Sequence, residues 1–160
     1  MSQSKTNAMR ILEQKKVNFS MNFYDNKDGK IDGISVAAKI GKDPAVVYKT
    51  LVCQGNSKNY YVFVIPVKEE LDLKKAARAA EEKNMDMIAV KDIQKVTGYI
   101  RGGCSPIGMK KEYKTFIDSS AAALDKIVVS GGKIGTQIEI EVADLQQVVD
   151  AGLEDVIKQP

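Results

Sequence analysis

The stretch from Gly98 to Gly108 could bind a ligand through its backbone. It reads Gly-Tyr-Ile-Arg-Gly-Gly-Cys-Ser-Pro-Ile-Gly, with four glycines and one proline in eleven positions. Gly102 and Gly103 can take positive φ and admit a ligand close to the main chain, and Pro106 restrains Ser105 to extended geometry. Amides presented in this way can bind a carbonyl or carboxylate oxygen, as in an oxyanion hole. A structural turn explains the same glycines equally well.

Lys49 is the second residue whose position suggests chemistry. It is flanked by Val46, Val47, Leu51 and Val52 in a run that is otherwise apolar and strand-like. Its stem can pack along apolar surface while the ammonium reaches water, which is the common behaviour of lysine. Alternatively the ammonium points into a cleft and binds an anionic or polarised oxygen. The local pattern leaves both possibilities open.

The chain contains no histidine, and this absence narrows the possible chemistry. Ser-His-Asp and Cys-His arrangements are excluded, as is the commonest general base at neutral pH. Cys53 and Cys104 are far apart and have no neighbouring Cys or His, so we expect two reduced thiols and no metal site. We also predict no cofactor. Catalysis would then depend on Lys, Asp, Glu, Tyr, backbone dipoles or groups of the substrate.

Positive charge gathers around the glycine-rich stretch. The 160-residue chain has a net charge of +3, and the window from Lys95 to Lys114 holds five basic residues against Glu112 alone, a local net charge of +4. This concentration favours an anionic partner such as a nucleic-acid backbone, although a solvated basic turn has the same composition. The residues that we predict to contact such a partner are Arg101, Lys110 and Lys111.

Short helices and strands must position these residues. Periodicity and capping signals predict helices over 5–16, 35–41, 71–83, 91–96 and 144–152, with Ser35 and Asp72 as the N-caps of the second and third. A further short helix is expected to begin at Asp43-Pro44 and to run into the strand at Tyr48. Strands are expected over 17–24, 48–53, 60–65, 87–90, 115–118, 126–130 and 137–142. The 60–65 strand is apolar at nearly every position and should be central in its sheet. In the first strand, strict alternation places Phe23 on the buried face and Tyr24 on the polar face.

The overall composition indicates one soluble domain. With 44% apolar residues, 160 positions are enough for one core and too few for two comfortable domains. We predict an α+β domain over 1–160, with a largely antiparallel, rolled, barrel-like sheet surrounded by helices. No apolar run approaches the roughly 18 residues of a membrane span, and the polar N-terminus lacks the apolar core of a signal peptide. We therefore expect a cytoplasmic protein with no membrane association.

Five motifs resemble those of the YbaK/EbsC family in order and spacing. They are Tyr48-Lys49-Thr50-Leu51, Leu71-Asp72-Leu73-Lys74-Lys75, Thr97-Gly98-Tyr99, Gly102 to Gly108, and Ser130-Gly131-Gly132-Lys133. That family is similar to the editing domain of bacterial prolyl-tRNA synthetases. Its free-standing members are aminoacyl-tRNA deacylases, and the type that this chain most resembles hydrolyses Cys-tRNA(Pro). The resemblance implies a mischarged tRNA as the substrate and prolyl-tRNA synthetase as a candidate partner.

The same resemblance implies roles for individual residues. Lys49 matches the family's junction lysine and would bind the ester or the terminal ribose. The substrate-cradling Gly-x-x-x-Pro loop comprises Gly102, Gly103, Cys104, Ser105 and Pro106. The residues that would line the aminoacyl pocket are Tyr24, Thr50, Ser130 and Gln137.

Two motifs depart from the cysteine-specific type. Its members often read Gly-Gly-Ile-Ser-Pro and Lys-Arg-Gly-x-Asp, whereas this chain has Cys104 in the first motif, and Ile134 and Gln137 in the second. These departures leave the preferred aminoacyl group open.

An aminoacyl ester is already activated, so positioning and oxyanion stabilisation can suffice for its hydrolysis. The family is thought to use groups of the substrate in place of a protein nucleophile, and a cysteinyl ester carries its own thiol. A competing class is a binding module that holds aminoacyl-tRNA or an amino acid without turnover. A thiol hydrolase based on Cys104 is disfavoured, because no histidine is present to activate the thiol.

Overall fold

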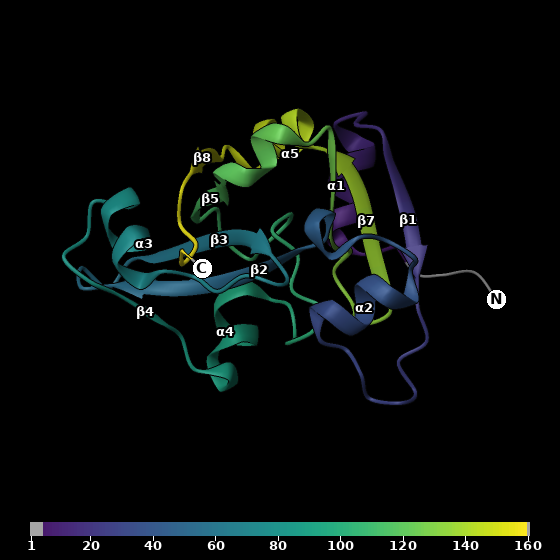
Figure 1. Ribbon diagram of the computed structural model, residues 1–160, viewed down its shortest axis with the longest axis horizontal. Helices are drawn as coiled ribbons and strands as arrows, with labels where there is room; N and C mark the ends of the chain where they lie inside the picture. The colour runs from purple at the N-terminus through teal and green to yellow at the C-terminus, as the bar shows by residue number, and fades with distance from the viewer. Residues whose placement is uncertain (1–4, 160) are drawn as a thin grey trace.

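The computed structural model describes residues 5–159 and divides the strands between two sheets (Figure 1). One sheet is antiparallel and has the order β1-β7-β6, with strands Phe19–Phe23, Thr136–Glu141 and Lys126–Ser130. The other has the order β4-β2-β3-β5-β8, with strands Met85–Met87, Tyr48–Gly55, Tyr60–Pro66, Lys114–Asp118 and Gly152–Glu154. A parallel bridge between Val47 and Val128 connects the two sheets.

The predicted α+β class is confirmed, but the prediction of one rolled, barrel-like sheet is wrong. Both sheets are open, and the larger one is mixed because β5 pairs parallel with β3 and with β8. Between β3 and β5 the chain passes through α3 (Leu73–Ala79), β4, α4 (Ile93–Thr97) and the glycine-rich stretch, and such a long crossover allows β5 to return in the direction of β3. The sequence gives no signal for β8, a three-residue strand that follows the last helix.

Five α-helices and three short 3-10 helices surround the sheets within residues 5–159. The α-helices are α1 (Asn7–Gln14), α2 (Gly33–Lys39), α3 (Leu73–Ala79), α4 (Ile93–Thr97) and α5 (Val142–Val149). The 3-10 helices are η1 (Pro44–Val46), η2 (Val90–Asp92) and η3 (Ser119–Ala123). Asp72 caps α3 as expected, while α2 begins earlier than predicted because Asp32, not Ser35, accepts the capping hydrogen bond. None of these helices has the length and apolar character needed to cross a membrane.

Strand β3 is buried on both faces, which confirms its predicted central place. Val62 and Val64 face a core shared with α1, α5 and the three-stranded sheet. Phe63 and Ile65 face the opposite way, into a second core that α3 covers (Figure 1). The start of β2 pairs with the end of this buried strand, Lys49 opposite Ile65, and this pairing fixes the backbone that carries Lys49.

The predicted alternation along β1 fails at its end. Phe23 is 51% exposed, whereas Tyr24 is half-buried with its hydroxyl inside the protein. The strand ends at Phe23, and the N–H of Tyr24 donates to the carbonyl of Gly135 at 3.0 Å. This bond extends the pairing of β1 with β7 by one residue. The Tyr24 ring is covered by Lys39, whose Nζ lies 5.7 Å from the ring centroid.

Candidate functional site

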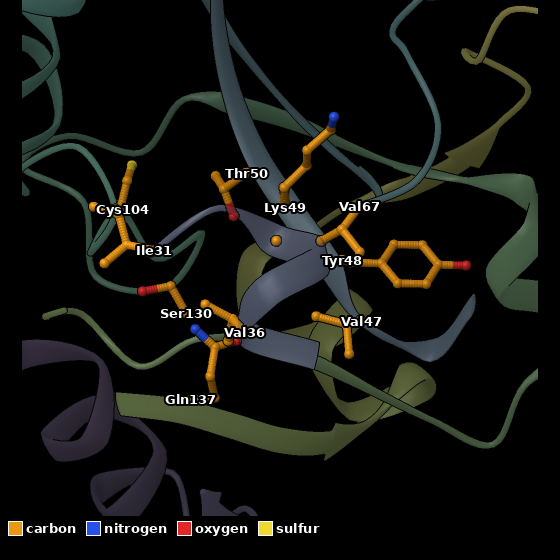
Figure 2. A pocket seen from close by; sticks show the side chains of 12 residues that line it. Ile31, Val36, Val47, Tyr48, Lys49, Thr50, Val67, Cys104, Ser130 and Gln137 are labelled. Carbon is orange, nitrogen blue, oxygen red and sulfur yellow. The ribbon is translucent and has the colours of Figure 1, made fainter. Parts of the chain in front are cut away.

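A pocket of about 130 Å³ lies where the start of β2 meets α2, β7 and two glycine-containing loops (Figure 2). The structure brings six of the predicted site residues into its lining: Lys49, Thr50, Gly102, Cys104, Ser130 and Gln137. These residues come from three strands and from a loop more than fifty positions after Lys49 and Thr50. The pocket is therefore a product of the tertiary fold.

The remaining predicted residues lie outside this lining. Gly103, Ser105 and Pro106 are buried, and Tyr24 lines a separate surface hollow with Lys39 over its ring. The three residues predicted to contact tRNA are exposed and also stand apart from the pocket: Arg101, Lys110 and Lys111. The ammonium of Lys110 donates to the carbonyl of Lys95 at 3.0 Å.

Gly103 is required because the 98–108 and 131–135 loops touch through their backbones. A Cβ at this position would lie 2.8 Å from Cα of Lys133 and 2.9 Å from the amide nitrogen of Ile134. Gly102 has a φ of 86°, and a Cβ there would lie 2.8 Å from Cδ1 of Ile31. The two glycines thus bring three separate segments together at one side of the pocket.

Hydrogen bonds fix both loops to the first helix. Thr6 donates from Oγ1 to the carbonyl of Gly131 at 2.6 Å, and Asn7 donates from Nδ2 to the carbonyl of Gly108 at 2.8 Å. Within the 98–108 loop, the N–H of Gly103 donates to the Ile100 carbonyl at 3.0 Å, so this amide serves the turn and does not face a ligand. The N–H groups of Gly102 and Cys104 form no hydrogen bond within residues 5–159 and remain available as donors.

Lys49 is half-buried at the second position of β2. Burial lowers the pKa of its ammonium, and the nearby carboxylates of Glu70 and Glu69 act in the opposite direction. Within the described chain this ammonium forms no hydrogen bond or salt bridge. In Figure 2 the side chain extends away from Ser130 and Gln137, so its charge stands at one end of the pocket. A partly desolvated cation in that position can bind an oxygen that carries negative charge.

Neutral polar side chains line another part of the pocket. Oγ1 of Thr50 is buried and has no hydrogen-bond partner within residues 5–159, and Figure 2 shows it directed to the opposite side from Nζ of Lys49. Gln137 is only 6% exposed, and it pairs with Ser130 across β7 and β6. An unsatisfied buried hydroxyl costs about 1–3 kcal/mol, so a bound polar group would relieve the cost at Thr50.

Cys104 lines the pocket as a neutral thiol. Burial raises its pKa to about 11, which leaves little thiolate at neutral pH and does not suit a nucleophile. The buried thiol of Cys53 has its pKa raised to about 12 by the same cause. Residues 5–159 contain no group of three His, Cys, Asp or Glu side chains placed to ligate a metal.

The sequence did not indicate the apolar half of the pocket. The additional lining residues are Ile31, Gly33, Val36, Val47, Tyr48 and Val67. Tyr48 contributes near its backbone, since its ring points away in Figure 2 and its hydroxyl pairs with Oγ of Ser120 at 2.7 Å. One feature of the sequence could have indicated this apolar lining: Ile31 is an isolated apolar residue in the polar stretch between Asp25 and Asp32.

Known proteins share this fold and much of this sequence. A family model described as "Aminoacyl-tRNA editing domain" matches residues 32–148. An Enterococcus faecalis protein named "Putative Cys-tRNA(Pro)/Cys-tRNA(Cys) deacylase EbsC" is 45% identical over 139 residues, which cover 87% of this chain and 85% of that protein.

Two solved structures show the same fold at low sequence identity. The first, described as "a putative trans-editing enzyme for prolyl tRNA synthetase", has a TM-score of 0.82 and 19% identity, over 98% of this chain and 100% of its own. The second, a hypothetical protein, has a TM-score of 0.87 and 18% identity, over 95% and 99% of the two chains. From the family match and the 45% identity, the chain belongs to the YbaK/EbsC family of aminoacyl-tRNA editing domains, as its motifs predicted.

Proposed function

We propose that this protein is a free-standing deacylase that hydrolyses the ester of mischarged aminoacyl-tRNA, with Cys-tRNA(Pro) as the preferred substrate. The observation that supports this most directly is the composition of the pocket, which joins one partly desolvated cation to neutral hydrogen-bonding groups. The family membership and the name of the Enterococcus faecalis relative support the same activity.

The size of the pocket favours a small aminoacyl group. Its volume is about 130 Å³, and a cavity of about 150 Å³ in a protein core can hold a benzene ring. A cysteinyl or alanyl group fits such a space, whereas a nucleotide does not. The terminal ribose and the rest of the acceptor end would then lie outside, toward the exposed basic residues Arg101, Lys110 and Lys111.

In the proposed reaction the protein positions the ester and stabilises developing charge. The ammonium of Lys49 binds the ester or the ribose oxygen, and the free N–H groups of Gly102 and Cys104 bind the carbonyl oxygen as it becomes negative. With a cysteinyl ester, the substrate sulfur bonds to the carbonyl carbon, the bond to the ribose oxygen breaks, and that oxygen leaves with the thiol proton. Water then opens the thiolactone to give free cysteine.

The deciding experiment measures release of free amino acid from Cys-tRNA(Pro), Ala-tRNA(Pro) and Pro-tRNA(Pro) under multiple turnover. We expect turnover of Cys-tRNA(Pro), much slower release from Ala-tRNA(Pro), whose aminoacyl group has no thiol, and none from Pro-tRNA(Pro). Binding without release would identify a non-catalytic module instead.

Lys49→Ala tests the site within the same assay. If the ammonium binds the reacting end, its loss should lower the single-turnover rate by about a hundredfold, equivalent to about 2.7 kcal/mol. Lys49→Arg should also be slow, because a planar fork on a longer arm does not reproduce a compact charge. The control is Lys126→Ala, which removes an exposed lysine at the start of β6. A normal rate in Lys49→Ala would contradict the mechanism. The preferred substrate would still be decided by the comparison of the three aminoacyl-tRNAs.

A further inference from the structure

Lys39 fills a ring of oxygen atoms close to the pocket. From the C-terminal end of α2, its ammonium donates to the carbonyl of Asp25 at 2.8 Å, to Oδ1 of Asp28 at 2.7 Å and to the carbonyl of Lys30 at 2.9 Å. These three bonds use all three N–H groups of the ammonium. The side chain is only 22% exposed, and Nζ also lies 5.7 Å from the ring centroid of Tyr24.

The 25–30 loop is shaped to present these oxygens. Oδ1 of Asp25 accepts from the N–H of Lys27 at 2.9 Å, and Oδ1 of Asp28 accepts from the N–H of Lys30 at 3.0 Å. Gly29 allows the turn with a φ of 76°. Two carbonyls and a carboxylate are oxygen ligands of the kind that hold hard cations in proteins. Here the cation is part of the chain.

The loop connects directly to one wall of the pocket. At its end the chain places Ile31 against Gly102 and continues into Gly33 and Val36, all of which line the cavity. At its start Tyr24 is fixed to Gly135 through its N–H. Residues 25–30 are exposed, so apolar burial contributes little to holding them in place. The Lys39 contacts are the main polar link between this loop and α2.

We propose that Lys39 is a positioning residue for the aminoacyl pocket: as the cation of the 25–30 loop, it holds Ile31 against Gly102 in the pocket wall. The importance of Lys39 for catalysis rests on the deacylase function proposed above. The effect of Lys39 on the position of Ile31 is independent of that function.

The test is chemical rescue of Lys39→Ala. The substitution removes the ammonium and its stem but leaves the three oxygens, so n-propylammonium can occupy the vacated space. We expect kcat/KM for Cys-tRNA(Pro) to fall about tenfold, mainly through KM, and to recover at least threefold with propylammonium. Tetramethylammonium at equal ionic strength has no N–H group and should not rescue. Enzyme-free blanks remove uncatalysed aminolysis, and Lys42→Ala is the control because Lys42 pairs instead with Glu139 at 3.1 Å.

A second readout does not depend on activity. The δ1 methyl resonance of Ile31, assigned with an Ile31→Leu variant, should shift or broaden in Lys39→Ala and return toward its original position with propylammonium. An unchanged Ile31 resonance in Lys39→Ala overturns the proposal, as does an equal response to both cations. If the unmodified protein releases no amino acid, the deacylase function fails, and the methyl measurement still decides whether Lys39 positions the pocket wall.

Discussion

Gly103→Ala should separate the two loops that form one side of the pocket. The added Cβ would meet the backbone of Lys133 at 2.8 Å, where ordinary van der Waals contact begins near 3.4 Å. Backbone atoms cannot rotate away as a flexible side chain can, so the loops must move apart by about 0.6 Å. Overpacking of this kind typically costs about 1–3 kcal/mol of unfolding free energy.

The same displacement should slow the reaction. Gly102 and Cys104 flank Gly103 and carry the amides that we expect to face the ester carbonyl. Because a misplacement of about 1 Å can cost about a hundredfold in rate, a shift of about 0.6 Å predicts a loss of about tenfold or more.

The assay is single-turnover deacylation of Cys-tRNA(Pro), with thermal unfolding followed in parallel. Gly152→Ala is the matched control, since a Cβ at that exposed position meets no atom within 4 Å. The control should keep both its rate and its melting temperature. If Gly103→Ala matched the unmodified protein in both measurements, the loop contact would not shape the site and the reasoning above would be refuted.

Further predictions concern charge and the thiol. Cys104→Ser should keep at least a tenth of the deacylation rate, and complete loss in a folded variant would point to a nucleophile. Alkylation of Cys104 by iodoacetamide at pH 8, followed by mass spectrometry, should be about a hundredfold slower than for an ordinary thiol, because a pKa of about 11 instead of 9.0 leaves that much less thiolate. Replacement of the basic set Arg101, Lys110 and Lys111 by Gln should raise KM and reduce its salt dependence with little change in kcat, and an unchanged salt slope would place tRNA binding elsewhere. Burial lowers the pKa of Lys49, so between that lowered pKa and 10.5 the lysine is protonated more often in the unfolded chain than in the folded one. The free energy of unfolding should therefore rise with pH across this window. Chemical denaturation at several pH values should show this rise in the unmodified protein and not in Lys49→Met.

The sequence by itself was sufficient for features that depend on neighbouring residues. The apolar run of β3 indicated a strand buried on both sides, and Asp72 indicated the start of α3, because burial pattern and capping act over a few positions. The absence of histidine and the motifs around Lys49 and the glycine-rich loop indicated the chemical class and the family.

The tertiary structure decided which distant segments meet. The need for glycine at position 103 comes from the backbone at Lys133, thirty residues later, and the role of Lys39 comes from oxygens of a loop that precedes its helix. Tyr24 is half-buried because Lys39 of α2 lies over its ring, and β5 is parallel to β3 because a long crossover connects the two strands. Such contacts depend on the packing of whole elements against one another. The periodicity within one helix or strand does not indicate which other element it will contact.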